Sequence, residues 1–507
     1  MAANPKQFVF LSLQKTLNRS PSTIQTIVPT LAQRLGDLTP GYQAQLTAAQ
    51  QALNPVYYDP NNSGAAFGNT NCLPALYAID ASPTACIPQT ELSAAGQALL
   101  NYYPPPNVTP TQTLDNYQAN VPGTSDSAQI SARYNRSFGA APARGQRGFG
   151  GGGGGRGNRN ANAPKVLRQS IAENFAYSHS ATGTESFSPQ LGGKSLTDGY
   201  SLSSGYTVGY GRINNSATLS WNRSRSLNSN YFTNVGLSSA DCSEDGIPAA
   251  DCVGMNPAVV AGVFVGTPTV SLYSKPFYYG VPSVGLTGLG GLSDQTPSNT
   301  VNQTIAFSES ARWTHKQHNT SYGFDFRRIH ADSIGGTNVL GSFTFSGAAS
   351  ENPTIPNCTQ SATQLCGSAV ADILLGLPQQ TTLQAGLNKI YLRGNSWDWY
   401  VNDDWRARSN LTFEYGLRWE YFSPYSEKYD RLVNLNLTDS AGSLTVTNVC
   451  GTAAPAGSPA GACAAVTSGT LVHPDKSLYS PRISVAWTPK FKFTKNTVCL
   501  LYTSRCV

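Results

Sequence analysis

The chain has 507 residues, and only 12% of them are charged, about half the fraction of an ordinary soluble domain. This composition disfavours a cytosolic enzyme, and a net charge of +6 gives little support to nucleic-acid binding. No apolar run reaches about 18 residues, so we expect no transmembrane helix. The start, MAANPKQFVF, lacks a charged segment followed by a long apolar one, so any export signal would lie upstream.

Ten segments are predicted to be β-strands. In chain order they cover 6–15, 128–138, 168–180, 200–211, 216–225, 301–313, 320–330, 391–402, 410–421 and 481–489. The clearest contains LTFEYGLRWEYF, in which an apolar or aromatic residue occupies every odd position from 411 to 421. This period of two predicts a strand with one apolar face. Phe413, Tyr415, Leu417 and Trp419 should therefore lie on one side of a sheet, and Glu414, Arg418 and Glu420 on the other.

Such strands suit two all-β folds. In a soluble sandwich the apolar face packs on a core, whereas in a membrane barrel it meets lipid and the polar face lines a wet lumen. Strands of about ten residues and apolar faces rich in Trp and Tyr favour the barrel. We therefore expect an antiparallel outer-membrane β-barrel portion of about ten strands, incomplete, with long loops that carry short helices.

The lengths of the connectors support this interpretation. Long connectors cover 16–127, 226–300, 331–390 and 422–480, with a moderate one at 181–199, whereas short ones cover 212–215, 314–319 and 403–409. Outer-membrane barrels have long extracellular loops and short periplasmic turns. Short helices are expected in the long connectors, beginning at Pro29 and Thr90 and covering 368–378.

The connector 139–167 falls on the periplasmic side by this count, and it contains RGQRGFGGGGGGRG at residues 144–157. Arginines among glycines also occur in RNA-binding segments. One short basic patch is weak evidence, and six consecutive glycines offer no platform on which bases could stack. We interpret the segment as a flexible linker that lies opposite the long loops, and expect no nucleic-acid partner.

Each long connector contains one close pair of cysteines. These pairs are Cys72 with Cys86, Cys242 with Cys252, Cys358 with Cys366, and Cys450 with Cys463. In an exported protein such local pairs are typical of disulfides that cross-link exposed loops. A zinc site is disfavoured because no C-x2-C motif is present.

Little in the sequence indicates catalysis or metal binding. No Walker loop, G-x-S-x-G or H-E-x-x-H motif is found, so we expect no enzyme and no cofactor. His315 and His318 in HKQH could offer two metal ligands, but they lack an evident third and lie in a predicted tight turn.

Six charged residues on the polar strand faces are candidate lumen residues. They could line a solute path, or pair with one another across a hydrated lumen, which is the interpretation we favour. The six are Asp325, Arg327, Asp398, Glu414, Arg418 and Glu420.

Several segments together resemble the Oar-like group of TonB-dependent outer-membrane transporters. They include FVFLSLQKT, TIVPTLAQRLGDL, IPQTELSAAGQALLNYYPPPN, ADILLGLPQQ, SWDWYVNDDWRARSNLTFEYGLRWEYF and YSPRISVAWTPK, in this order over residues 8–497. The resemblance implies a 22-stranded barrel with an internal plug, preceded by a small sandwich domain. It also implies energised uptake of a bulky solute, with a TonB-type complex, outer-membrane lipid and an unknown solute as partners.

The chain departs from that family in ways that predict a fragment. No plug, energy-coupling box or sandwich domain is recognisable, so residues 1–498 are expected to be part of a barrel whose first and last strands are open edges. Such a fragment should be prone to aggregate alone. The end, residues 499–507, lacks alternation and is interpreted as a foreign or frame-shifted tail that adds no well-packed strand. A secreted β-rich binding or adhesion module remains the alternative.

Overall fold

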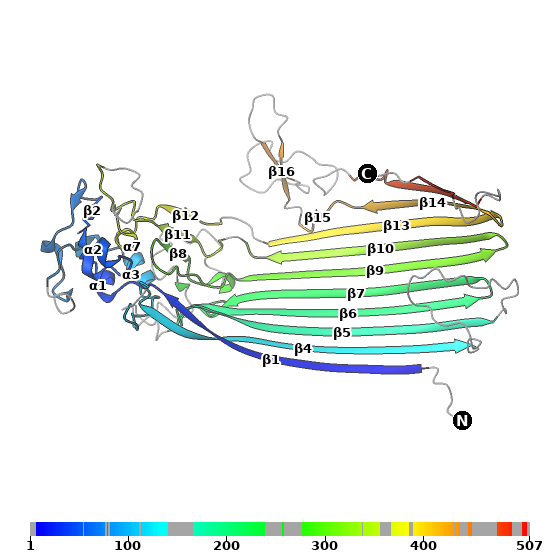
Figure 1. The fold of residues 1–507 in the computed structure, drawn as a ribbon, viewed down its shortest axis with the longest axis horizontal. Helices are drawn as coiled ribbons and strands as arrows, with labels where there is room; N and C mark the ends of the chain where they lie inside the picture. The colour runs from blue at the N-terminus through cyan, green and yellow to red at the C-terminus, as the bar shows by residue number, and fades with distance from the viewer. Residues whose placement is uncertain are drawn as a thin grey trace.

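The computed structural model describes residues 7–238, 256–257, 276–354, 367–429, 432–436, 445–448, 474–488 and 499–503. Within these ranges, positions 54, 77–78, 80–81, 111–112, 140–165, 337 and 385–388 are not described. The described chain forms one large antiparallel sheet with a group of folded loops at one end of it (Figure 1).

The main sheet follows the chain almost without interruption. Its strand order is β1-β4-β5-β6-β7-β9-β10-β13-β14-β18-β19, and the short β15 (Ser426–Glu427) pairs with β13. The strands are β1 (Gln7–Thr26), β4 (Tyr117–Gly139), β5 (Leu167–Glu185), β6 (Gly192–Tyr210), β7 (Ile213–Asn230), β9 (Ser298–His315), β10 (His318–Ile334), β13 (Lys389–Arg408), β14 (Leu411–Phe422), β18 (Tyr479–Trp487) and β19 (Cys499–Thr503). Neighbours in the chain are neighbours in the sheet, as in an up-and-down barrel.

All ten predicted strands are present, and most are longer than predicted. The strand predicted at 6–15 continues to Thr26, and the strand predicted at 128–138 begins at Tyr117. In these extensions polar residues and prolines predominate on both faces, as in NRSPST of β1, so no apolar period marks them. The ladder continues nevertheless, because β1 and β4 stay in register from Gln7–Arg136 to Thr26–Tyr117.

The sheet is open in the described residues, since β1 pairs only with β4 and β19 only with β18. The expected edge at β1 is therefore confirmed. Residues Cys499–Thr503, where no well-packed strand was expected, do form a strand that pairs with Trp487–Ile483 and makes β19, not β18, the far edge, while the packing of its side chains stays untested. An exposed strand edge accepts a new partner through its unpaired backbone groups, which explains how a segment without alternation can extend a ladder.

The two ends of the sheet differ as the connector lengths predict. Tight turns join β6 to β7, β9 to β10 and β13 to β14 at one end, which we call the turn end. The loops after β1, β7 and β10 gather at the opposite end and form a cap (Figure 1). The glycine-rich segment 144–157 lies outside the described residues, but Gly139 and Leu167, where its connector joins the strands, lie at the turn end.

The cap is built from short elements of three loops. The first loop contains α1 (Leu31–Arg34), η1 (Pro40–Tyr42), α2 (Ala48–Ala52), β2 (Tyr58–Asp59), β3 (Ala65–Ala66), η2 (Asn69–Asn71), η4 (Gln89–Glu91) and α3 (Ala94–Leu100). The second contains η5 (Pro276–Tyr278) and β8 (Ser283–Leu286), and the third contains β11 (Ser342–Phe345), α7 (Ala369–Leu375) and β12 (Gln380–Thr382). The three helices that the sequence predicts are thus present as α1, α3 and α7. Outside the cap, β16 (Val433–Asn436) pairs with β17 (Thr445–Asn448).

The cap has its own hydrophobic core. β8 pairs in parallel with β11, and β11 pairs with β12, so the second and third loops share a small sheet. The helix α7 is buried along its whole length against α3. Buried residues of all three loops meet in one cluster, among them Val28, Ile87, Leu99, Leu100, Tyr103, Val281, Leu286, Leu292, Val370, Ile373 and Leu374. Burial of this apolar surface explains why loops this long fold together.

One of the expected disulfides lies in the described residues. Cys72 and Cys86 are bonded, with Cα atoms 5.0 Å apart, and link two parts of the first loop. Cys242, Cys252, Cys358, Cys366, Cys450 and Cys463 lie outside the described residues, so their pairing stays a prediction.

Two buried carboxyl groups stabilise turns of the cap. Asp294 accepts hydrogen bonds from the backbone N–H groups of Gln295, Val281 and Gly192, at 2.9, 3.2 and 3.3 Å. Burial raises the pKa of Asp294 to about 7, although these three donors act in the opposite direction. Burial likewise raises the pKa of Asp372 to about 6, against donors that include the hydroxyl of Ser350.

The stability of the cap should therefore fall as the pH rises. The folded cap binds the Asp294 proton more tightly than the unfolded chain does. The stabilisation that results from this proton is complete below about pH 4 and is lost as the pH rises to about 7, which lowers the free energy of unfolding by up to about 4 kcal/mol. Limited proteolysis of the cap between pH 5 and pH 8 measures this loss of stability. In Asp294→Asn the stability of the cap should depend less on pH between pH 5 and pH 8. It should also be lower at every pH, because the amide NH2 group cannot accept hydrogen bonds as the carboxyl oxygen does. Equal cap stability at both pH values in the wild type would contradict the prediction.

Candidate functional site

The register gives the main sheet two chemically distinct faces. Cross-strand partners are continuous from β1 to β18, with one irregularity between Trp405 and Arg408 in β13. All seven tryptophans of the chain lie on the same face, which we call the aromatic face. They are Trp221, Trp313, Trp397, Trp399, Trp405, Trp419 and Trp487.

The predicted separation of the faces in β14 is confirmed. On the aromatic face the rings of Trp405 and Phe413 stack with centroids 5.4 Å apart, and those of Trp399 and Trp419 lie 6.4 Å apart. Arg418 projects to the other side, where it meets Asp398 and Glu420. Alternate residues of an extended strand point to opposite faces, so the two kinds of contact cannot share a side.

The aromatic face is exposed. Leu219 is 54% exposed, Trp313 46% and Leu202 45%. A soluble sandwich would cover such a face with a second sheet. Among the described residues no second sheet does so, and the buried hydrophobic core lies in the cap instead. The aromatic face therefore suits an apolar surrounding that is not part of this chain.

The opposite face, which we call the polar face, has a neutral sector. On β6 its positions carry only Gly, Ser and Thr, from Gly193 through Ser201 and Ser203 to Gly209. On β7 they carry only Ser, Thr and Asn, from Asn214 through Ser220 and Asn222 to Asn230. No ionisable side chain occurs at these positions.

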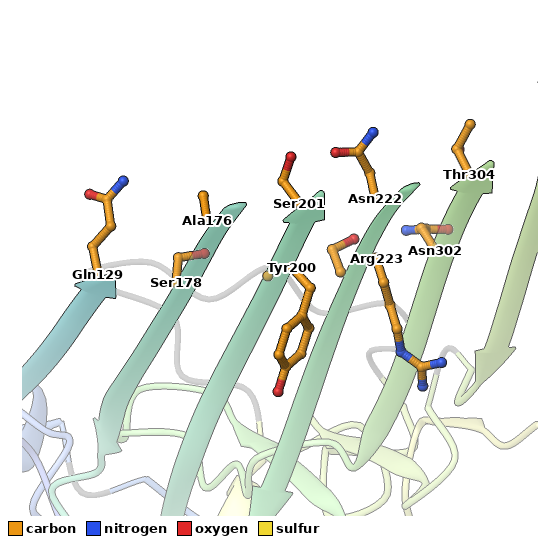
Figure 2. Close-up of a pocket in the computed structure, with 11 residues that line it drawn as sticks. Gln129, Ala176, Ser178, Tyr200, Ser201, Asn222, Arg223, Asn302 and Thr304 are labelled. Atoms are coloured by element: carbon orange, nitrogen blue, oxygen red, sulfur yellow. The ribbon is translucent and has the colours of Figure 1, made fainter. Parts of the chain in front are cut away.

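Small side chains leave this sector hollow. A shallow pocket is lined by Gln129, Ser178, Ser201, Asn222, Asn302 and Thr304. In Figure 2, Ser201, Asn222 and Thr304 point to one side of the sheet, whereas Tyr200 and Arg223 point to the other. Asn228 bonds Ser195 at 2.7 Å and Ser298 at 2.8 Å, so the amides tie neighbouring strands together through hydroxyls. Such a surface of hydroxyls and amides suits water or a polar partner, since it offers no apolar area to bury.

The six charged candidates form a second sector on the polar face. Arg418 of β14 forms ion pairs with Asp398 of β13 and, at 2.6 Å, with Glu420. Asp325 of β10 is the register partner of Asp398 and pairs with Arg327 at 2.8 Å. Glu414 lies apart and accepts a hydrogen bond from Ser484 at 3.0 Å. Five of the six thus pair with one another along the sheet and Glu414 does not, while pairing across a lumen and a role in lining a solute path stay predictions.

Removal of the Arg418 charge should destabilise this sector. Asp398 and Glu420 are direct cross-strand partners, so Arg418→Gln leaves two carboxylates facing each other without their shared cation. We expect a loss of about 1 kcal/mol, measured as a lower urea midpoint. The double variant Arg418→Gln with Asp398→Asn should recover most of the loss. No recovery in the double variant would show that the effect is not electrostatic.

The histidines of HKQH belong to a turn. His315 and His318 are register partners at the β9–β10 turn, where their rings pack on Trp313 and Trp405, and His318 contacts Asp403 at 2.6 Å. No group of three potential metal ligands gathers in the described part of the chain. The interpretation as a turn is confirmed by this geometry.

A family model described as an outer membrane beta barrel domain matches residues 4–499. The chain belongs to this family. It is therefore an outer-membrane β-barrel domain. In such barrels the strand face rich in aromatic residues meets lipid and the polar face lines the lumen. Across the residues that the structure describes, no helix combines the length and apolarity required to cross a membrane.

Solved transporter structures are similar to the chain only weakly. One is the outer membrane transporter YddB from Escherichia coli, with 10% identity and a TM-score of 0.26, covering 74% of this chain and 35% of that one. Another is the ferric-catecholate import receptor Fiu from E. coli K12, with 10% identity and a TM-score of 0.24, covering 72% and 44%. The chain thus spans less than half the length of either. No curated protein matches.

The neutral sector was not predicted as a unit, because only charged residues were selected as candidates. The signal was available, because every second residue of 193–209 and 214–230 is small or an uncharged amide. Joining the strands into one surface required the register.

Proposed function

We propose that this chain forms part of the barrel wall of a TonB-dependent transporter of the Oar-like group, which takes up a bulky solute. The observation that carries the proposal is the polar face, where a neutral hydroxyl and amide sector adjoins a charged sector across consecutive strands. Such a face suits a wide hydrated lumen rather than a packed interior. The proposal assigns the chain no catalytic role and no cofactor.

The open edges support the view that other segments complete the barrel. Unpaired backbone groups at β1 and β19 would cost several kcal/mol each in lipid, so both edges require strand partners. In the proposed transporter these strands, together with an internal plug and the contact for the TonB-type complex, lie in a longer protein. Residues 499–507 would then be a foreign tail, and β19 would occupy the place beside β18 that the next barrel strand takes in the longer protein. The isolated chain should aggregate unless an added strand closes it.

The experiment uses the full-length protein in planar lipid bilayers. A plugged barrel should conduct little in buffer and should open to a large conductance when urea unfolds the plug. The periplasmic domain of the TonB-type protein, immobilised on beads, should retain the full-length protein. A protein that refolds as a monomer without detergent and never conducts would instead be the secreted binding or adhesion module. Conductance without retention would leave a passive pore and refute energised uptake.

A further inference from the structure

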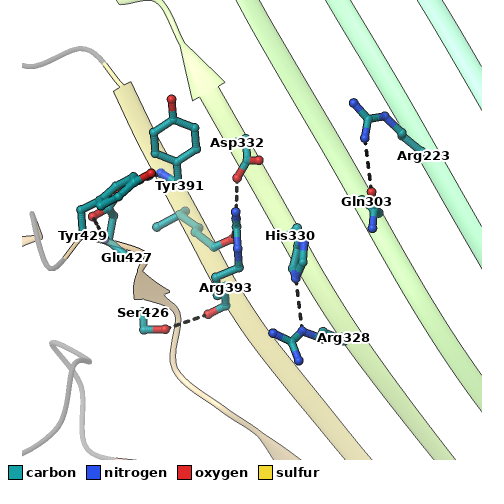
Figure 3. A network of polar contacts seen from close by, with 11 residues as sticks. Arg223, Gln303, Arg328, His330, Asp332, Tyr391, Arg393, Ser426, Glu427 and Tyr429 are labelled. Atoms are coloured by element: carbon teal, nitrogen blue, oxygen red, sulfur yellow. Dashed lines mark hydrogen bonds and ion pairs between the residues drawn. The ribbon is translucent and has the colours of Figure 1, made fainter.

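Three arginines lie on the lipid-facing aromatic face at the cap side of its apolar belt. β7 runs toward the cap from Ile213, and Arg223 and Arg225 follow Trp221 at alternate positions. β10 runs in the same direction, and Arg328 follows Phe326 in the same way. Figure 3 shows Arg223 and Arg328 on the ribbon of these strands. A guanidinium in the hydrocarbon itself would cost about 2–4 kcal/mol, so these positions mark the depth at which headgroups begin.

The side-chain hydrogen bonds of these three cations go to neutral groups. Arg223 donates to the Gln303 side chain at 3.4 Å, and Arg225 donates to the Asn299 side chain at 3.1 Å. Arg328 donates to the His330 ring at 3.2 Å. Across the described ranges none of the three forms an ion pair with a carboxylate, in contrast to Arg393 on the neighbouring strand, which pairs with Asp332 (Figure 3).

Arg223 belongs to a wider basic row, and Arg225 and Arg328 lie in the rows on either side of it. Arg223 is the register partner of Gln303, Gln303 of His330, and His330 of Arg393. Adjacent strands lie about 4.8 Å apart, so the row spans about 14 Å along the membrane surface. Asp198 of β6 is the register partner of Arg225 on the same face and offsets part of its charge, whereas the register partners of Arg223 and Arg328 are uncharged.

We propose that Arg223, Arg225 and Arg328 bind the phosphate groups of an anionic membrane lipid in the leaflet that surrounds the cap end of the barrel. The planar guanidinium offers paired N–H donors that fit phosphate, which makes arginine better suited to this ligand than lysine. The site faces outward from the lumen, so a lipid reaches it laterally and a transported solute does not. The inference rests on membership of the outer-membrane barrel family and not on the proposed transport function.

The test uses the full-length protein in nanodiscs of phosphatidylcholine. A phosphorylated glycolipid is added in one arm, its dephosphorylated form in a second and millimolar inorganic phosphate in a third, and native mass spectrometry counts the bound molecules. The wild type should retain the phosphorylated glycolipid alone. The triple variant Arg223→Gln, Arg225→Gln and Arg328→Gln should lose about a hundredfold in affinity, since each cation at an anionic surface contributes roughly a factor of five.

Two control variants keep the result interpretable. Arg133→Gln, Arg168→Gln and Arg312→Gln together remove three charges from the polar face and should leave retention unchanged. Replacement of the three lipid-facing arginines by lysine keeps the charge and should retain most of the binding even if the glutamine variant folds poorly. Equal retention by the wild type and the glutamine variant, equal binding of the dephosphorylated glycolipid, or saturation of the site by free phosphate would each overturn the proposal.

Discussion

Leu219→Arg should reduce the stability of the membrane-inserted barrel by about 2–4 kcal/mol, the cost of a cation on a lipid-facing strand near the bilayer midplane. Leu219 lies on the aromatic face of β7, between Ile213 at the turn end and Trp221 toward the cap, and is 54% exposed. Its cross-strand partner on β9 is Phe307, so the new charge would meet no acceptor there. Urea unfolding of the full-length protein in lipid vesicles measures the loss.

The adjacent residue provides the matched control. Ser220 lies on the polar face between Ser203 and Ala306, where small side chains leave room for a hydrated arginine. Ser220→Arg should change stability within about 0.5 kcal/mol. If both variants lost the same stability, or if Ser220→Arg lost more, the assignment of the two faces would be wrong.

Gly96→Ala should unfold part of the cap. Gly96 lies inside α3, where it contacts α7 so closely that a Cβ atom would meet the carbonyl oxygen of Ile373 at 1.9 Å. α3 and α7 also join through the Ser93 N–H, which donates to the Leu374 carbonyl at 2.6 Å. Alanine favours a helix over glycine by about 1 kcal/mol, yet the overpacking should cost about 3 kcal/mol and decide the outcome.

The direction in which the hydrogen-exchange rate changes shows whether the close contact between the helices or the helix propensity of alanine dominates. Hydrogen exchange at Leu99 and Leu100 in the full-length protein should accelerate in Gly96→Ala. Gly41→Ala is the control, because a Cβ atom there would meet nothing within 4 Å. Slower exchange in Gly96→Ala would mean that propensity dominates and that the two helices pack less closely than described.

The alternating strands were predictable from sequence because one face carries tyrosine, tryptophan and leucine. LTFEYGLRWEYF corresponds to β14 almost residue for residue. The extensions of β1 to Thr26 and of β4 from Tyr117 were not predictable, because their few apolar residues follow no period of two and only the cross-strand ladder maintains the strand. β19 was missed for a different reason, because its sequence CLLYT does not alternate and only its backbone pairing identifies it as a strand.

The candidate site was predictable in part. The period of two places Asp398, Arg418 and Glu420 on the polar face, and their mutual pairing follows once β13 and β14 are neighbours. The buried Asp294 could not be identified from sequence, because the N–H groups that bond it come from distant segments at Gly192 and Val281. Local patterns contain no information about contacts between loops that meet only in the cap.

Quenching of tryptophan fluorescence by brominated lipids tests the orientation of the sheet most directly. All seven tryptophans of this chain lie on the aromatic face, so in a full-length variant whose other tryptophans are replaced by phenylalanine the fluorescence reports on that face alone. If the aromatic face meets lipid, lipids brominated on their acyl chains should quench most of the emission, and aqueous iodide should quench little. Strong quenching by iodide and none by brominated lipid would contradict the barrel orientation.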